Sequence, residues 1–412
     1  MFDVDRFLLK IETQNPNPES DLDGYLTPID TVNQSREIKL LIYIDQTNFS
    51  TPCLLKTIMW IIMNLDPEID SFIKIWLTAI TSMIFCHQIA ARIPGGAARL
   101  LSILPIIYLF TILPTHLSSV LLGAPTMFYL VWLGNFKLLL FSFDIQGPLS
   151  SSSTPPLSLP HFVSIALLPI EMKETSSTKQ ITNPLLIYSK RKKAAAIFAI
   201  KCLILAAIVS SYKYRDFFHP YVILVLYILN VYLGEEIGLA ISALPARAIP
   251  GLMEIEPQFK DPLLATSLQD FWGRRWNLPS SGILRPTVYR PIRRISERVL
   301  GKSWALSLAI VATFAVSGLM HQLLYYFLSR VRPTWEMTWF FVLHGFCVAA
   351  EVAAKKALAG RWRLHRMVSG PLTVAFVAVT AVWLFFSQII RDGMERRAID
   401  EYYVSFAATL KF

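Results

Sequence analysis

Residues 303–329 read SWALSLAIVATFAVSGLMHQLLYYFLS, and this stretch decides how the chain folds. It contains no Lys, Arg, Asp or Glu, and it is long enough to cross a lipid bilayer as a tilted helix. His321 lies well inside it. An imidazole at that depth must form a hydrogen bond or face a polar cavity, because lipid offers it no partner. The stretch therefore predicts a membrane-spanning helix with one position of special chemistry.

The polar residues of this predicted helix recur at a spacing of four. Thr313, Ser317, His321 and Tyr325 fall on one stripe, so they form a polar seam on an otherwise apolar surface. Gly318 lies one turn before His321, where the missing side chain lets another backbone or a ligand approach closely. Periodicity alone fits two roles equally well. His321 is either a packing histidine that bonds a neighbouring helix or a residue that acts in catalysis or ligand binding.

The composition of the chain indicates an integral membrane protein. Of its 412 residues, 54% are hydrophobic and only 17% are charged, and the mean hydropathy is +0.46. A soluble protein of this size would carry more charge. The net charge of +10 is better explained by basic cytoplasmic loops than by nucleic-acid binding. Such loops could also contact anionic lipid or a phosphorylated cosubstrate. We expect an all-α, polytopic integral membrane protein.

The chain divides into a polar arm, residues 1–52, and a membrane-embedded domain, residues 53–412. The arm is rich in Pro and Asn and is expected to be partly disordered. About eight transmembrane helices are predicted, with long polar loops at 144–193 and 245–302. The predicted spans are 75–91, two helices in 100–136 that separate near Pro114, 194–212, 217–244, 303–329, 337–354 and 367–390.

Basic residues orient these helices. Residues 245–302 and 355–366 are heavily basic. Between these two segments lie the predicted spans 303–329 and 337–354, and the turn that connects the two spans has only Arg330 and Arg332. The positive-inside rule places the basic segments in the cytosol. The cluster at 190–193 then falls on the same side, two crossings earlier.

The segment that precedes the His321 helix combines aromatic and basic residues. Residues 267–277 read SLQDFWGRRWN. If the segment is helical, Trp272 and Trp276 share one face and Asp270 pairs with Arg274 on another. The aromatic rings would anchor the segment at the level of the lipid headgroups, while the guanidinium groups stay in water or bind phosphate. A cytosolic amphipathic segment on the membrane surface, without further function, is the alternative.

Two motifs resemble a known family. Residues 262–277 (PLLATSLQDFWGRRWN) and 317–322 (SGLMHQ) are similar to the FW-x-RRW-[HN] and SGLxHE patterns of the wax synthase-like branch of the membrane-bound O-acyltransferase superfamily. That branch includes plant wax-ester synthases and fungal acetyltransferases of terpenoid and meroterpenoid pathways. The resemblance covers roughly residues 185–390 and departs at Gln322, where the family usually has an acid. Gln322 can form hydrogen bonds but carries no charge, so no proton-relay role is assigned to it.

The resemblance implies acyl transfer from a coenzyme A thioester to an alcohol. His321 would be the catalytic base, because a neutral imidazole can take the hydroxyl proton. Asn277 would stabilise the oxyanion or orient the cosubstrate. Ser317, on the stripe of His321, would be a hydrogen-bond partner or cavity lining. The residues expected to bind acyl-CoA are Trp272, Arg274, Arg275 and Trp276, with Arg293 and Arg294 as further cations for its phosphates.

The resemblance to the fungal members favours acetyl-CoA as donor and a terpenoid or meroterpenoid alcohol as acceptor, in the endoplasmic reticulum membrane. Two alternatives stay open: a long-chain acyl-CoA:alcohol wax-ester synthase, and a non-enzymatic transporter. No permanently bound cofactor is expected. No metal is expected either, because the seven histidines and four cysteines form no cluster at metal-ligand spacing.

Three further ionisable residues lie in predicted spans. His344 is interpreted either as a partner of the site or, preferably, as an ordinary histidine of the helix bundle. Glu351, seven residues later, is expected to snorkel at the cytosolic end. Glu235 is expected to mark a membrane interface.

Overall fold

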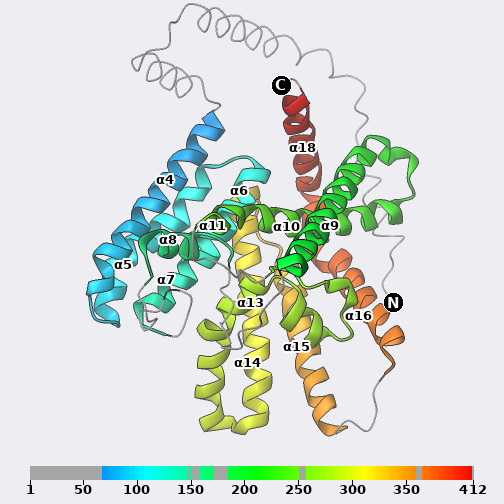
Figure 1. Ribbon diagram of the computed structural model, residues 1–412. Helices are drawn as coiled ribbons and strands as arrows, with labels where there is room; N and C mark the ends of the chain where they lie inside the picture. Colours follow the sequence, from blue (N-terminus) through cyan, green and yellow to red (C-terminus); the bar gives the residue numbers. More distant parts are fainter. Residues whose placement is uncertain are drawn as a thin grey trace, which may run out of the picture. The chain divides into compact units, whose positions relative to one another are not determined.

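The computed structural model describes residues 67–145, 149, 157–170, 184–249, 257–358 and 364–410. The chain separates into two compact units, Met1–Ser71 and Phe72–Phe412. The first unit contributes only the start of helix α4 to the described residues, and all other described elements belong to the second (Figure 1). The predicted polar arm at 1–52 lies outside the described residues.

Every regular element in the described part of the chain is helical. The longer helices are α4 (Pro67–Gln88), α5 (Ala97–Ile112), α6 (Val120–Met127), α7 (Asn135–Ser142), α8 (Leu159–Leu167), α9 (Pro184–Ser211), α10 (Pro220–Ser242), α13 (Leu278–Leu284), α14 (Arg290–Ser329), α15 (Glu336–Ala357), α16 (Arg366–Thr380), α17 (Phe386–Arg391) and α18 (Met394–Leu410). Among the described residues, eight helical stretches are long and apolar enough to span a membrane. The all-α, eight-helix prediction is confirmed.

The break predicted near Pro114 is present. Helix α5 ends at Ile112, a short 3-10 turn covers Leu113–His116, and the next stretch begins at Val120. That stretch joins α6 and α7 through a π-helix at Phe128–Gly134. Helix α18 is attached to its start, because the Glu401 carboxylate accepts hydrogen bonds from the backbone N–H groups of Val120 and Leu121. A carboxylate stabilises a helix N-terminus by satisfying N–H groups that lack partners within the helix.

The long loop predicted at 144–193 is wrong in two places. Residues Leu159–Leu167 form helix α8, whose apolar side chains Phe162 and Ile165 are buried. Helix α9 begins at Pro184, so the basic cluster at 190–193 is helical and not part of a loop. Lys and Arg are good helix formers, and a polar composition alone therefore did not distinguish a helical turn from a loop.

The second long polar segment, 245–302, also folds into helices. It contains α11 (Leu244–Arg247), α12 (Leu268–Asp270), α13 and two π-helical stretches, Phe271–Arg275 and Arg285–Tyr289. Helix α14 then begins at Arg290 and reverses direction at Gly301, whose φ of 75° suits a residue without a side chain. Figure 1 shows the two arms side by side, joined at the lower end of the view. Leu284 of α13 and Val288 of the π-helical stretch before α14 pack with Val316 and Met320 of the second arm.

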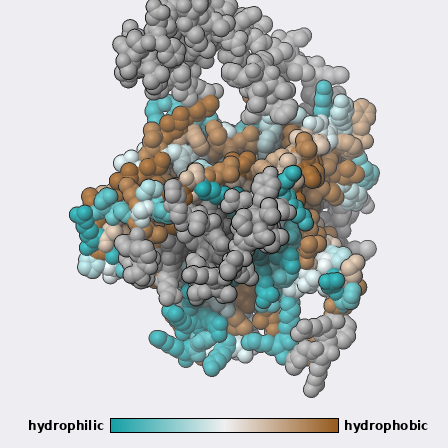
Figure 2. Space-filling model, in the orientation of Figure 1, coloured by the Kyte–Doolittle hydropathy of each residue, from teal (hydrophilic) through white to brown (hydrophobic). Residues whose placement is uncertain are grey.

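Helices α14 and α15 cross closely and run antiparallel. A Cβ on Gly318 would lie 2.9 Å from the carbonyl oxygen of Thr338, and one on Gly345 would lie 2.8 Å from Cβ of Phe314. Missing side chains at both positions let the helices approach, as expected for Gly318. The reversal at Gly301 and the Lys355 end of α15 therefore lie at the same end, which is hydrophilic (Figure 2). The prediction that the whole of 245–302 lies on the same side of the membrane as 355–366 stays a prediction.

Candidate active site

His321 lies on the second arm of α14, one turn after the Gly318 crossing. Its Nδ1 is 2.8 Å from the carbonyl oxygen of Ser317. A carbonyl can only accept, so Nδ1 carries the proton and Nε2 is the unprotonated nitrogen of the neutral ring. The hydrogen bond thus fixes both the orientation of the ring and the nitrogen that can act as a base.

Three aromatic rings surround His321. Phe341 stacks on it at 4.2 Å between ring centroids with an interplanar angle of 24°. Trp132 and Phe385 meet it edge-on, at 5.0 Å and 5.9 Å. These rings exclude water from most of the imidazole and restrict its rotation. The imidazole is therefore held in place at the cavity wall.

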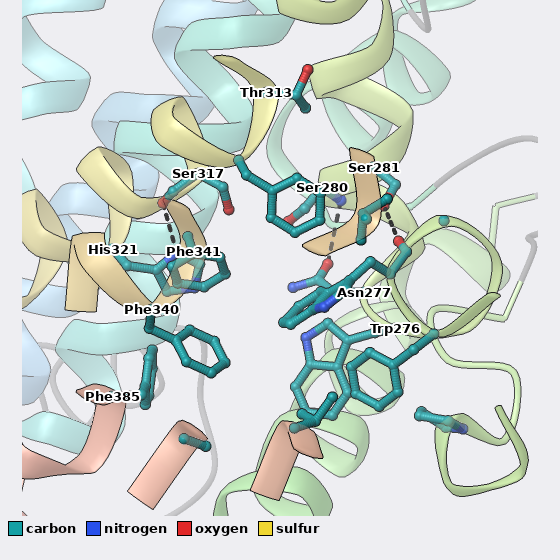
Figure 3. A pocket seen from close by; sticks show the side chains of 18 of the residues that line it. Trp276, Asn277, Ser280, Ser281, Thr313, Ser317, His321, Phe340, Phe341 and Phe385 are labelled. Carbon is teal, nitrogen blue, oxygen red and sulfur yellow. Dashed lines mark hydrogen bonds between the residues drawn. The ribbon is translucent and has the colours of Figure 1, made fainter. Parts of the chain in front are cut away.

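The segment that carries Asn277 is docked beside this helix. Phe271–Arg275 is a π-helix, and Asn277 follows it in the left-handed conformation with φ of 38°. Its Oδ1 accepts a hydrogen bond from the Ser280 N–H at 3.3 Å and caps α13. Because the oxygen is occupied in this way, the amide NH2 of Asn277 points toward the cavity (Figure 3).

One cavity of about 520 Å³ unites the two sequence motifs. Figure 3 shows His321, Phe340, Phe341 and Phe385 on one side and Trp276, Asn277 and Ser280 on the other. Its walls are mostly apolar or aromatic with a few polar groups, as in sites for small apolar molecules. The predicted site residues that line it are Trp272, Trp276, Asn277, Ser317 and His321.

All four π-helical stretches in the described residues contribute to the walls of this cavity. They supply Trp132, Trp272, Tyr289 and Phe385, one from each stretch, among other lining residues. A π-turn holds one extra residue, so it shifts the direction of the side chains that follow. Such turns occur frequently at functional sites. Here they turn aromatic side chains into the cavity.

Arg274 and Arg275 do not line the cavity. The Arg275 Nε donates to the Asp270 carboxylate at 2.7 Å, and its Nη1 donates to the carbonyl oxygens of Lys260 and Asp261. The predicted Asp270–Arg274 pair is therefore wrong, because the π-turn brings residue i+5 instead of i+4 to Asp270. Arg274 is exposed. Its role, and that of Arg275, toward acyl-CoA stays a prediction.

The other predicted cations also lie outside the cavity lining. Arg293 is paired with Glu297 at 2.8 Å, and Arg294 is exposed. Among the described residues, the arginine that lines the cavity is Arg285, on the π-turn after α13.

The polar stripe of the helix divides between two environments. Thr313, Ser317 and His321 line the cavity, whereas the Tyr325 hydroxyl donates to Asp392 at 2.7 Å. Gln322 is buried and donates to Gln388 on α17 at 3.1 Å. Gln322 is therefore a link between helices on a different face from His321.

Glu235 and Glu351 differ in part from their expected roles. Glu235 lines the cavity and is thus more than a marker of the interface. The Glu351 carboxylate accepts the backbone N–H of Leu268 at 2.8 Å and pairs with Lys355 at 2.6 Å. It holds the Asn277 segment against α15, which a snorkelling side chain would not do.

Sequence reasoning missed Trp132, Phe341 and Phe385, which contact His321. Gly318 predicted that another backbone approaches closely near His321, and Phe341 lies on the helix that does so. A residue of that helix could therefore have been expected beside His321. Trp132 and Phe385 are distant in sequence and lie in apolar spans, where nothing local distinguishes them from packing residues. In the described part of the chain, no group of three or more metal-binding side chains is found.

The arrangement can carry out a proton transfer next to a developing negative charge. The unprotonated Nε2 of His321 can take a proton from a hydroxyl. The Asn277 amide can donate to an oxyanion, although it lies on a different segment. The apolar walls would admit hydrophobic molecules and keep water out. These are the requirements for acyl transfer to an alcohol.

Comparison with known families agrees with this chemistry. A sequence profile of the membrane bound O-acyl transferase family matches residues 255–343. The matched range includes both the Asn277 segment and His321.

Similar proteins are known from plants. A long-chain-alcohol O-fatty-acyltransferase of Simmondsia chinensis is 48% identical over 350 residues, which cover 85% of this chain and 98% of the relative. An acyl-CoA–sterol O-acyltransferase of Arabidopsis thaliana is 42% identical and covers 81% of this chain and 94% of its own length. A probable long-chain-alcohol O-fatty-acyltransferase of Arabidopsis thaliana is also 42% identical, over 82% of this chain and 96% of its own.

Proposed function

This chain belongs to the membrane-bound O-acyltransferase family, in its wax synthase-like branch, and we propose that it transfers a long-chain fatty acyl group from acyl-coenzyme A to a long-chain alcohol. The observation that carries the proposal is the cavity itself. His321 and Asn277 lie on separate segments of the sequence, yet both line one largely apolar chamber. The two relatives named for long-chain alcohols support the choice of acceptor.

The reaction proceeds by direct transfer. His321 Nε2 accepts the proton of the alcohol as its oxygen attacks the thioester carbonyl carbon. The carbonyl oxygen becomes an oxyanion, to which the Asn277 amide donates. When the tetrahedral intermediate collapses, the carbon–sulfur bond breaks and the thiolate of coenzyme A takes the proton from His321. The products are an ester and free coenzyme A, and no acyl-enzyme forms.

The acetyl donor and terpenoid acceptor favoured by the resemblance to fungal members become the competing specificity. None of these three relatives is named as an acetyltransferase, and two are named for long-chain alcohols. The long-chain alternative is therefore preferred. A sterol acceptor is the second candidate, because one relative is named for it. The endoplasmic reticulum is the proposed membrane.

The test is ester synthesis in microsomes from a host that makes no wax esters. Labelled palmitoyl-CoA is supplied with a long-chain alcohol or a sterol, and labelled acetyl-CoA with a terpenoid alcohol. We expect the long-chain ester to dominate. His321→Ala should reduce the rate by about 10²–10⁴-fold, the usual contribution of a general base.

A matched control is His116→Ala. The His116 Nδ1 also contacts a backbone carbonyl oxygen, that of Leu113, but the residue is exposed and lies outside the cavity lining. We expect it to behave as the wild type. A His321→Ala protein that is well expressed and fully active would remove the mechanism. A dominant acetyl or sterol ester would replace the proposed specificity but leave the mechanism intact.

A further inference from the structure

His344 is a histidine on α15 that the proposed reaction does not use. It is completely buried, with 0% of its surface exposed, and it is not among the residues that line the cavity. Both of its ring nitrogens have partners. Trp272 Nε1 lies 3.0 Å from Nδ1, and Thr380 Oγ1 lies 2.9 Å from Nε2. A buried histidine with this arrangement has a defined orientation that an apolar residue of similar size would not provide.

The hydrogen bonds determine the proton positions. An indole N–H can only donate, so His344 Nδ1 is unprotonated and the neutral ring carries its proton on Nε2. Nε2 then donates to the Thr380 hydroxyl, which itself donates to the carbonyl oxygen of Phe376 at 2.7 Å. The result is a continuous chain of donors from Trp272 through His344 and Thr380 to Phe376. It ties the cavity wall to helices α15 and α16.

Trp272 is the end of this chain that faces the site. It lines the cavity, and its ring centroid is 5.8 Å from that of Phe341. Phe341 in turn stacks on His321, with 4.2 Å between the ring centroids. A displacement of the Trp272 indole would therefore shift Phe341, the ring that stacks on the catalytic base His321. Packed aromatic contacts of this kind leave little room for independent movement.

The same face of α15 also holds residues 267–269, the start of the segment that carries Trp272 and Asn277. Glu351 accepts the Leu268 N–H, and Lys355 donates to Ser267 Oγ at 3.1 Å and Gln269 Oε1 at 3.3 Å. His344, Glu351 and Lys355 follow one another at intervals of seven and four residues, which places them on one face of the helix. His344 and Lys355 each bond a side chain that lines the cavity, Trp272 and Gln269 respectively, but of the two only His344 is buried.

We propose that His344 is a positioning residue for acyl transfer, which holds the Trp272 indole so that the wall beside His321 is formed before substrate binds. This inference rests on the proposed function. It assigns His344 a role beyond that of an ordinary histidine of the bundle. The expected consequence of its replacement is a loss in kcat without a comparable change in KM, because His344 touches neither substrate.

Two substitutions separate positioning from packing. His344→Leu keeps a similar volume but removes both hydrogen bonds, and we expect kcat to fall about 10- to 100-fold, as for residues that orient a catalytic group. KM for the alcohol should stay within about twofold. His344→Gln can accept from the indole and donate to Thr380, so it should recover most of the lost kcat. Trp272→Phe removes the donor, and combined with His344→Leu it should cause no further loss.

The control is His87→Leu. His87 lies on α4 outside the cavity lining and bonds the Leu157 carbonyl oxygen at 3.0 Å through one ring nitrogen. Its loss should lower the melting temperature but leave kcat within about twofold. The Trp272 hydrogen bond can be observed directly by ultraviolet resonance Raman spectroscopy of the indole N–H. A difference between wild type and His344→Leu should appear, and it should vanish in the Trp272→Phe background.

The outcomes are distinct. If His344→Leu kept full kcat, His344 would have only a packing role. The same would follow if His344→Gln lost as much kcat as His344→Leu and had an equally lowered melting temperature. Additive losses from His344→Leu and Trp272→Phe would also overturn the inference. Absence of ester synthesis in the wild type with every donor and acceptor would instead overturn the proposed function and the catalytic part of this inference. The Raman difference would still decide whether His344 holds Trp272.

Discussion

Gly318→Ala adds one methyl group at the crossing of α14 and α15. The new Cβ would lie 2.9 Å from the carbonyl oxygen and 3.0 Å from Cα of Thr338, and 3.2 Å from Cβ of Phe341. The first two are backbone atoms, which cannot rotate away as the end of a side chain can. Helix α15 must therefore move by a few tenths of an ångström, and Phe341 moves with it.

The expected cost combines two opposing terms. Ala is favoured over Gly inside a helix by about 1 kcal/mol. Overpacking of a well-packed contact costs about 1–3 kcal/mol, and the rigid backbone contact points to the upper part of this range. We therefore expect a net destabilisation of about 1–2 kcal/mol. Because misplacement by 1 Å can cost about 10²-fold in rate, a smaller shift of Phe341 against His321 should lower kcat about tenfold.

The assay is thermal unfolding of the purified protein in detergent, with ester synthesis measured on the same preparation. Gly238→Ala is the matched control, since Gly238 lies inside helix α10 and a Cβ there would meet nothing within 4 Å. It should be as stable as the wild type or more stable, and fully active. If Gly318→Ala matched it in both measurements, the close crossing would not be what positions His321.

Other substitutions test the roles of single polar side chains. Asn277→Asp keeps the cap on α13 and the left-handed conformation but loses the NH2 donor, so kcat should fall about 10²-fold with little change in melting temperature. Arg275→Ala should lower the melting temperature, because Arg275 bonds Asp270 and two backbone carbonyls, whereas Arg274→Ala should leave it unchanged and raise KM for acyl-CoA. Burial raises the pKa of Glu395 on α18 from 4.5 to about 7 and outweighs the nearby Arg396. The folded protein then binds this proton more tightly than the unfolded chain, so stability is greatest below pH 4.5 and is lost as the pH rises to about 7. The full effect is about 3 kcal/mol, and Glu395→Gln should abolish it.

Each of these predictions has a result that contradicts it. Wild-type kcat in Asn277→Asp would exclude the amide as the oxyanion donor. A melting temperature that falls in Arg274→Ala and not in Arg275→Ala would contradict the assignment of the ion pair. Melting temperatures between pH 4.5 and 8 test Glu395, with Asp400→Asn as control because Asp400 is an exposed carboxylate on the same helix. A flat wild-type curve, or a slope that survives Glu395→Gln, would refute that prediction.

Local patterns were sufficient wherever one segment decides the outcome. Apolar runs with few or no charges predicted the eight spans, and Pro114 marked the break between two of them. The spacing of Ser317 and His321 placed both on one helical stripe, and they line the same cavity. Where composition was ambiguous, the prediction was wrong. The basic cluster at 190–193 suits a loop or a helix, and it is helical.

By itself, then, the sequence determined a bundle of membrane-spanning helices, a histidine within one of them and an aromatic segment ahead of it. Hydropathy and periodicity act along the chain, so they are visible in the order of residues. Only the tertiary structure decided that Asn277 shares a cavity with His321, that Trp132 and Phe385 enclose the imidazole, and that His344 bonds Trp272. These contacts depend on a reversal at one glycine, on how closely two helices cross, and on π-turns that shift side chains by one residue. Such features arise from packing between segments, which no local pattern specifies.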